Sequence, residues 1–281
     1  MKKKIAFLLI ISCALVAISC NNSSQKNGND SSGFAIQTVV GKNVPPIKQG
    51  VNTVAEIYAK PQVPILCYHR ITYGRKDNYT VSPATFDAQM KILADSGYHS
   101  ILPSQLYDYL VYNKPLPQKP VMITFDDSRV EHSVIAAPVM EKYGLRGVFF
   151  IMTITYNKKN YMTTAQIAQL AKAGHTVGLH SWDHTMVIKY NKESDWKKEV
   201  EEPKKRLEKI VSRPVDYWAY PYGIYDQKSA KELSKYFKLS FTLLSKRDSI
   251  LPLQTIRRMV VLEWTPQVLL KSMHRTFRRQ H

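Results

Sequence analysis

Val121-Met122-Ile123-Thr124-Phe125-Asp126-Asp127 is the stretch that decides the fold of this 281-residue chain. Its first part is typical of a short buried strand, and two carboxylates follow directly. Adjacent carboxylates repel each other unless a cation or another partner offsets their charge. An isolated Asp-Asp pair is most often a surface turn. Because this pair follows a strand that should be buried, we expect a metal-binding or catalytic role.

Three other apolar stretches also lead into residues that can do chemistry. The stretches and the residues after them are Val63–Tyr68 with His69, Thr176–Leu179 with His180 and His184, and Tyr217–Tyr220 with Tyr222. In a β/α barrel the carboxyl ends of the strands form one face, and active sites lie on it. We therefore expect these residues to meet the Asp126–Asp127 pair.

Helical patterns separate the expected strands. The expected helices run from Ser82 to Gly97, from near Ser104, through Val134 to Gly144, from Thr164 to Ala173, from Trp196 to Ile210 with a kink at Pro203, and through Ala230 to Phe237. Such alternation predicts parallel strands crossed by helices. With about seven units, a barrel is favoured over an open sheet.

His180 and His184 are four residues apart and suit a metal ion. Two exposed histidines on a helix would give the same spacing, so the pair alone is weak evidence. With a carboxylate pair upstream, it predicts a site in which Asp127, His180 and His184 bind one ion. Zinc accepts imidazole nitrogen together with carboxylate oxygen, and three protein ligands leave a position open for water.

Three motifs resemble those of the polysaccharide deacetylase family, carbohydrate esterase family 4. They are Thr124-Phe125-Asp126-Asp127-Ser128, His180-Ser181 with His184, and Trp218-Ala219-Tyr220-Pro221-Tyr222-Gly223. The resemblance covers residues 62–262 and implies a distorted (β/α)7 barrel that removes acetyl groups from N-acetylated sugars. It also implies that Asp126 is the catalytic base and Asp127 a metal ligand.

Pro64-Ile65-Leu66-Cys67-Tyr68-His69-Arg70 resembles the start of circularly permuted members that deacetylate poly-N-acetylglucosamine. In those members the acid histidine lies on the first strand, which implies His69 as general acid. The alternative for His69 is a hydrogen-bonded structural histidine. His274, in a basic stretch of helical pattern, is the lower-ranked candidate for the acid.

Two positions depart from the family pattern. Ser128 replaces the usual Gly, and it would be strained or obstructive if the position needs a positive φ or close substrate approach. Ala219 stands where an Arg often pairs with the base. Arg258 resembles a later Arg of the permuted members and could supply that charge; otherwise it is an exposed basic residue at a strand start.

The resemblance implies hydrolysis assisted by a divalent metal, Zn2+ in the first place, with Co2+, Ni2+ or Fe2+ as alternatives. Asp126 would take a proton as metal-activated water attacks the acetamide, the backbone N–H of Tyr222 would stabilise the oxyanion, and His69 would protonate the amine. Poly-N-acetylglucosamine is the favoured substrate. Peptidoglycan, chitin oligosaccharides or another N-acylated sugar remain open. So does a catalytically weak glycan-binding protein with the same fold.

The N-terminus resembles a bacterial lipoprotein signal. Residues 1–19 combine Lys2–Lys4 with a short apolar run, and Ala17-Ile18-Ser19-Cys20 resembles a lipobox, so we expect Cys20 to carry lipid. Residues 20–60 are expected to be a flexible linker and residues 61–281 the catalytic domain. The protein would then be anchored in the cell envelope, facing the periplasm or the cell surface. Cys67 is expected to be a small buried residue.

Charge limits the partners. The formal net charge is +18, which suits anionic surfaces such as lipid head groups or acidic cell-surface polymers. Nucleic acid would be the other reading of a high isoelectric point, but the N-terminus directs the chain out of the cytoplasm. We therefore expect no nucleic acid partner.

Overall fold

The computed structural model describes residues 50–74 and 77–278. The expected signal, Cys20 and the linker up to residue 49 lie outside the described residues. None of the helices in the described part of the chain combines the length and hydropathy of a membrane span.

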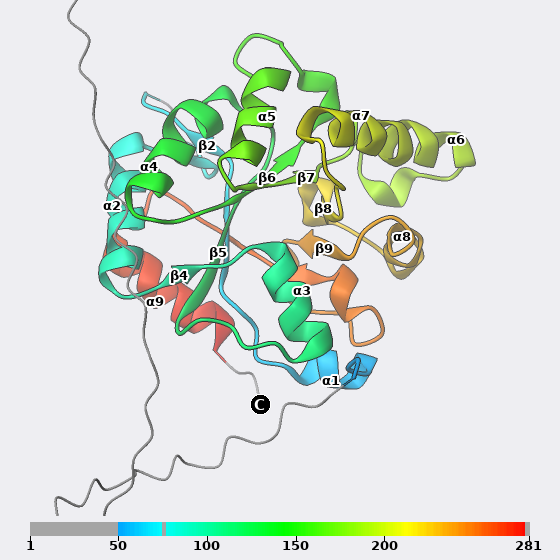
Figure 1. Ribbon diagram of the computed structural model, residues 1–281, viewed down its shortest axis with the longest axis horizontal. Coiled ribbons are helices and arrows are strands. Elements are labelled where there is room, and N and C mark those ends of the chain that lie inside the picture. Colours follow the sequence, from blue (N-terminus) through cyan, green and yellow to red (C-terminus); the bar gives the residue numbers. More distant parts are fainter. Residues whose placement is uncertain (1–49, 75–76, 279–281) are drawn as a thin grey trace, which may run out of the picture. The chain divides into compact units, whose positions relative to one another are not determined.

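A parallel barrel forms the centre of the domain (Figure 1). Its consecutive strands are β1 (Ile65–Tyr68), β5 (Pro120–Phe125), β6 (Val148–Ile151), β7 (Thr176–Leu179), β8 (Tyr217–Ala219) and β9 (Leu239–Thr242). Each pairs in parallel with the next along this order. The strands are short and almost continuously apolar because both faces are covered. The expected strands therefore agree with the structure to within about two residues at their ends.

One extended segment closes the barrel. β10 (Ile256–Arg257) pairs with β9, and β11 (Met259–Val260) pairs with β1 at the other end of the sheet. Arg258 lies between these two short strands, and its N–H donates to the carbonyl of Thr242 at 3.0 Å. Counted as one strand, this segment is the seventh of the barrel, which confirms the expected (β/α)7 architecture.

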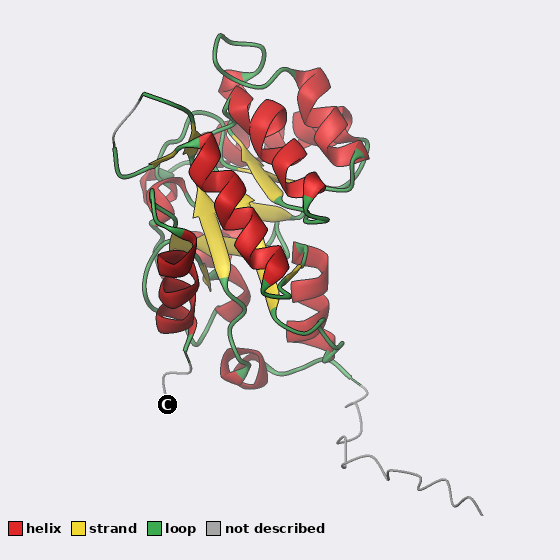
Figure 2. Cartoon of the chain, turned by 90° about the vertical axis from the view of Figure 1, so that its left-hand side faces the viewer, coloured by secondary structure: helices red, strands yellow, loops and turns green. Residues whose placement is uncertain are grey.

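Helices cover the outside of the barrel (Figure 2). They are α2 (Pro83–Asp95), α3 (Pro103–Tyr112), α4 (Ala137–Lys142), α5 (Thr164–Lys172), α6 (Glu193–Trp196), α7 (Glu202–Val211), α8 (Gln227–Leu233) and α9 (Pro266–Phe277). Ser82 caps α2, where its hydroxyl accepts the N–H of Thr85. Short strands β2 (Arg70–Ile71), β3 (Thr80–Val81) and β4 (His99–Ser100) complete the β structure of the described residues.

The expected kink near Pro203 takes the form of a π-helical turn. Residues Lys197–Glu201 form this turn between α6 and α7, directly before the proline. A second π turn, His132–Ala136, precedes α4, which has Pro138 in its first turn. Proline has no N–H to donate and its ring crowds the preceding turn, so the backbone widens before it.

Two apolar layers hold the barrel together, because side chains alternate along each strand. The inner layer fills the barrel and includes Ile65, Met122, Phe150 and Phe241. The outer layer lies under the helices and includes Leu66, Ile123, Phe125, Phe149 and Trp218. Because side chains alternate, Cys67 shares its orientation with Ile65, two positions before it, and Asp126 shares its orientation with Met122, four positions before it.

The chain upstream of residue 61 contributes to the domain, which corrects part of the expected linker. α1 (Val54–Ala59) buries Ile57 in the inner layer together with residues of α3. The side-chain amide of Asn52 donates to the carbonyl of Leu110 at 2.7 Å. From the sequence, residues 34–60 are ambiguous, and loose packing on the domain is an alternative to a free linker. The contacts of α1 are long-range and leave no local pattern.

Replacing Ile57 by Ala tests whether α1 belongs to the folded domain. The change leaves a cavity at the base of the barrel, so the free energy of unfolding should fall by about 2 kcal/mol or more. Val54→Ala on the same helix is the control; Val54 is 50% exposed and the change should cost less than about 0.5 kcal/mol. Equal effects of the two substitutions in chemical denaturation would contradict a packed α1.

Candidate active site

The carboxyl ends of the strands converge on one cleft, which we call the site cleft. It has a volume of about 300 Å³. His69 comes from the end of β1, Asp126 and Asp127 from the end of β5, and His180 from the end of β7. His184 and Tyr222 follow β7 and β8 and complete the set expected from the sequence. Arg70, Asp77, Tyr79, Arg129, Gly223 and Leu243 also line the cleft.

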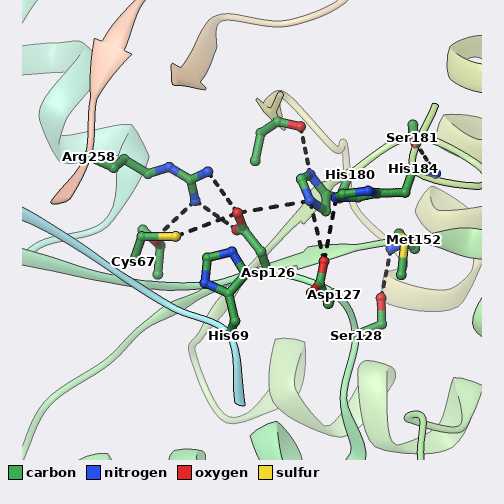
Figure 3. A network of polar contacts seen from close by, with 12 residues as sticks. Cys67, His69, Asp126, Asp127, Ser128, Met152, His180, Ser181, His184 and Arg258 are labelled. Carbon is green, nitrogen blue, oxygen red and sulfur yellow. Dashed lines mark hydrogen bonds and ion pairs between the residues drawn. The ribbon is translucent and has the colours of Figure 1, made fainter. Parts of the chain in front are cut away.

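Asp127, His180 and His184 form a compact triangle (Figure 3). The Oδ1 atom of Asp127 lies 3.7 Å from Nε2 of His180 and 3.6 Å from Nε2 of His184. Ligand atoms of a tetrahedral zinc ion with bonds near 2.1 Å lie about 3.4 Å apart. The three groups therefore fit one divalent ion with little movement.

Hydrogen bonds fix the ring of His180 and the backbone at His184. Nδ1 of His180 lies 2.8 Å from the carbonyl of Ala219, which fixes the proton there and leaves Nε2 free as a ligand. The backbone N–H of His184 donates to the hydroxyl of Ser181 at 2.8 Å. Burial, together with nearby His180, lowers the pKa of His184. Neutral imidazole is the form that binds a metal.

Glu199 supports the loop between the two histidines and was not found from the sequence. Its carboxylate accepts the backbone N–H groups of Trp182 and Asp183 at 3.2 and 3.4 Å. Burial raises the pKa of Glu199, and Lys198 at 3.0 Å works against this rise. The glutamate comes from the π turn before α7, so only the folded topology brings it to this loop.

Asp126 has a different partner from Asp127. The guanidinium of Arg258 donates to both oxygens of Asp126, at 2.7 and 2.8 Å, and both side chains are buried. Burial opposes ionisation, but Arg258, followed by His180, holds the pKa of Asp126 well below its usual range. The structure thus places Arg258 where the missing arginine at Ala219 would have been needed, and not on an exposed strand start.

Cys67 makes a contact that the sequence did not suggest. Its thiol donates to Oδ2 of Asp126 at 3.6 Å. Burial raises the pKa of the Cys67 thiol well above its usual range, so the group stays protonated and acts as a donor. Cys67 is buried as expected, but one of its neighbours is the carboxylate.

His69 lies next to Asp126 and lines the same cleft as the ligand triangle (Figure 3). A ring nitrogen of His69 lies within 4.8 Å of both the Cys67 thiol and a carboxylate oxygen of Asp126, which are equally close to each other. Burial lowers the pKa of His69, while Asp126 and Asp127 raise it. Its Nδ1 atom is buried without a hydrogen-bond partner among the described residues. The rival His274 lies on α9 and contacts the Tyr98 hydroxyl, outside the cleft lining.

Ser128 has a positive φ of 58°, the backbone conformation in which a serine is strained. Its hydroxyl does not obstruct the cleft, because it accepts the N–H of Met152 at 2.7 Å and is buried. Figure 3 shows this hydroxyl directed away from the ligand triangle. The serine therefore has a strained backbone, but its side chain makes a buried hydrogen bond that glycine could not make.

Left-handed backbone is concentrated in the loops of the site. Asp127, Ser181, His184 and Tyr222 have φ values of 75°, 63°, 73° and 60°. Each such residue costs on the order of 1 kcal/mol and persists only where surrounding contacts impose it. The strain turns several side chains of neighbouring loops toward one point.

Three aromatic residues at or near the motifs, Tyr222, Trp218 and Trp182, lie in three different environments. Tyr222 is 60% exposed at the cleft, and its ring centroid lies 4.4 Å from that of His184. Trp218 is fully buried and packs on Phe237, which is the core role. Trp182 lies under the Lys198 ammonium and is outside the cleft lining.

Comparisons with known proteins agree with this geometry. Residues 113–237 match the family described as Polysaccharide deacetylase. By sequence and fold, the chain is similar to the polysaccharide deacetylase family. This similarity agrees with the expectation of a hydrolase acting on the carbon–nitrogen bond of N-acetyl groups.

Two curated relatives are similar over part of their length. The putative polysaccharide deacetylase YxkH of Bacillus subtilis is 29% identical over 62% of this chain and 61% of its own. A poly-beta-1,6-N-acetyl-D-glucosamine N-deacetylase of Staphylococcus aureus is 27% identical over 60% of this chain and 63% of its own. The chain thus spans about three fifths of the length of these relatives.

Solved structures share the fold. The IcaB structure from Ammonifex degensii has a TM-score of 0.62 and 25% identity, over 77% of this chain and 97% of that one. The Streptococcus pyogenes deacetylase PplD, in complex with acetate, has a TM-score of 0.69 and 24% identity, over 76% and 99% of the two chains. The distorted barrel is therefore common to this chain and deacetylases of known structure.

Replacing Ser128 by Gly tests the balance at this position. The variant relieves the positive φ but leaves the buried N–H of Met152 without an acceptor, which costs about 1–3 kcal/mol. We expect a net loss of stability of about 1 kcal/mol, measured by chemical denaturation, with bound metal retained. A variant clearly more stable than the wild type would show that strain outweighs the hydrogen bond.

Proposed function

We propose that this protein is a metal-dependent N-deacetylase of N-acetylglucosamine units in a polysaccharide, with poly-N-acetylglucosamine the favoured substrate. One observation carries the proposal: two adjacent carboxylates have separate partners. Asp127 lies with His180 and His184, whereas Asp126 is held by Arg258. A purely glycan-binding protein has no need for this division.

Asp127, His180 and His184 would hold the divalent ion. Their mixed nitrogen and oxygen donors suit Zn2+, with Co2+, Ni2+ or Fe2+ as alternatives. When bound, such an ion polarises a carbonyl and lowers the pKa of water. The exposed side of the ligand triangle faces the site cleft, where an acetamide can enter.

Asp126 serves as the base. Arg258 donates to both oxygens of Asp126 and Cys67 donates to Oδ2 as well, so a second acceptor direction remains on Oδ1. The carboxylate therefore stays ionised at neutral pH and can still accept a proton from the attacking water. Its low pKa makes it a weak base, so its role is to orient the water and hold the proton briefly.

His69, next to Asp126, serves as the acid. Burial lowers the pKa of His69, and Asp126 and Asp127 work against this, so the imidazole can gain and lose a proton during turnover. It donates to the departing nitrogen, while the backbone N–H of Tyr222 stabilises the oxyanion. The products are acetate and a glucosamine unit.

The chain order of the catalytic groups and the names of the relatives support the favoured substrate. The acid His69 lies on the first strand, as in the permuted poly-N-acetylglucosamine deacetylases that the sequence resembles. The S. aureus relative carries that activity in its name. Peptidoglycan, chitin oligosaccharides and other N-acylated sugars are the second candidate, because Tyr79 and Tyr222 offer stacking surfaces that suit any of them.

The same proposal includes a place in the cell envelope. The sequence Ala17-Ile18-Ser19-Cys20 resembles a lipobox, so a lipid on Cys20 would tether the domain to a membrane facing the periplasm or the cell surface. An acidic cell-surface polymer is a further proposed partner, given the net charge of +18.

Acetate release from β-1,6-linked N-acetylglucosamine oligomers tests the function directly. Zinc-loaded wild-type protein should release acetate, and Asp126→Asn should lower kcat by about 10²–10⁴-fold because it removes the base. Asp95→Asn, an exposed carboxylate on α2, should leave kcat unchanged. The assay should be repeated with chitin and peptidoglycan fragments to rank the substrates.

The outcomes separate the candidate functions. Activity confined to another glycan would retain the chemistry and reject the favoured substrate. Equal inactivity of wild type and Asp126→Asn on all glycans, with binding of one of them, would reject the enzyme in favour of a glycan-binding protein.

A further inference from the structure

The base of the barrel carries a second cleft, which we call the basal cleft, with a volume of about 670 Å³. It lies between the end of α1, the linker into β1, the loop after β9, Arg257 of β10 and the end of α9. Figure 1 shows α1 and the end of α9 at the same end of the domain. The linker precedes β1, so this cleft lies at the amino ends of the strands and away from the site cleft.

The lining of the basal cleft is strongly cationic. Its charged residues are Lys60, Lys246, Arg247, Arg257 and Arg278, and no acidic residue of the described part of the chain lines it. If the excess of lysine and arginine were spread evenly over the surface, acidic residues would be expected among the lining residues as well. The concentration of one sign of charge in a concave surface attracts anions.

Arg247 and Arg257 have only uncharged acceptors. Arg247 donates to the carbonyls of Ile57 and Tyr58, both at 3.3 Å. Arg257 donates to the amide oxygen of Gln62 at 3.3 Å and to the carbonyl of Thr276 at 3.4 Å. The Nε atoms of both arginines are buried and have no hydrogen-bond partner among the described residues. Two guanidinium groups thus keep unused donors.

Electrostatics favour a bound anion between them. Burial lowers the pKa of Arg247, Tyr58 works against this, and the charge of Arg257 lowers it again. Burial is also the cause that lowers the pKa of Arg257. Partly buried like charges without a counter-ion are costly, and an anion would offset both the repulsion and the lost hydration. Burial lowers the pKa of Lys60, and the charge of Glu56, which does not line the cleft, works against this.

Aromatic rings hold both guanidinium groups in place. Arg247 lies over the ring of Tyr58 at 5.5 Å, and Arg257 over that of Phe277 at 5.8 Å. A guanidinium held in this way presents a planar fork of donors, which matches phosphate oxygens. We propose that the basal cleft binds a phosphate group, carried either by a soluble phosphate compound or by the head group of a membrane lipid.

Calorimetric titration with inorganic phosphate at low ionic strength tests the site. The variant Arg247→Gln/Arg257→Gln should bind at least about tenfold more weakly than the wild type, because it removes both charge-assisted donors. Lys205→Gln/Lys209→Gln is the matched control, since it removes the same charge from exposed positions of α7. It should bind as the wild type does.

Arg247 also supports α1, so folding needs its own check. Thermal unfolding should show whether the double variant is intact. Lys246→Gln/Arg278→Gln alters exposed lining residues only, and should weaken phosphate binding without changing the unfolding midpoint. These variants keep the proposal testable even if the first one fails to fold.

Sedimentation with vesicles distinguishes the two sources of phosphate. Binding to phosphatidylglycerol vesicles that is lost in the cleft variants but not in the control assigns a lipid head group. Phosphate binding without such vesicle binding assigns a soluble phosphate compound. No saturable binding of either, or equal losses in the cleft variants and the α7 control, would overturn the proposal. Neither measurement depends on acetate release. A failure of the phosphate proposal is therefore distinguishable from a failure of the proposed function.

Discussion

The buried ion pair between Arg258 and Asp126 joins the fold to the chemistry. Arg258 lies in the segment that closes the barrel between β9 and β1, so its position depends on both ends of the sheet meeting. Removing either partner would leave an uncompensated buried charge, which is far more costly than losing a surface pair. The pair also keeps Asp126 ionised and separate from the ligand triangle. The contact between Arg258 and Asp126 therefore links barrel closure to the different roles of the two carboxylates.

The rest of the site is shaped by loops that a relaxed backbone would not adopt. Left-handed residues follow β5, β7 and β8, and each loop is fixed by a specific hydrogen bond or ring contact. The hydroxyl of Ser181 holds His184, and the carboxylate of Glu199 holds the loop between them. Such strain is tolerated because the barrel beneath is packed on both faces. At the other end of the barrel, the basal cleft is lined by lysine and arginine, whereas the site cleft also contains aspartate and histidine.

Much of the barrel could be predicted from the sequence because its strands are apolar runs with chemistry at their ends. The stretches before His69, Asp126 and His180 are all strands of the parallel sheet, and their polar residues meet as expected. A strand start near Arg258 was expected, but β10 and β11 have too few residues to predict that this segment closes the barrel, and the packing of α1 leaves no local pattern. The environment of Ser128 depends on a contact with Met152 from another strand end, which no local signal records. The contact of Cys67 with Asp126 is equally long-range.

The central claim is that the two carboxylates serve different partners, and anomalous diffraction at the zinc absorption edge tests it most directly. In crystals of zinc-loaded protein, we expect one peak within bonding distance of Asp127, His180 and His184. Asp126 should still be paired with Arg258 and should not be bonded to the ion. A peak bonded by Asp126 with Cys67 and His69, which form the other possible ligand group, would contradict the claim.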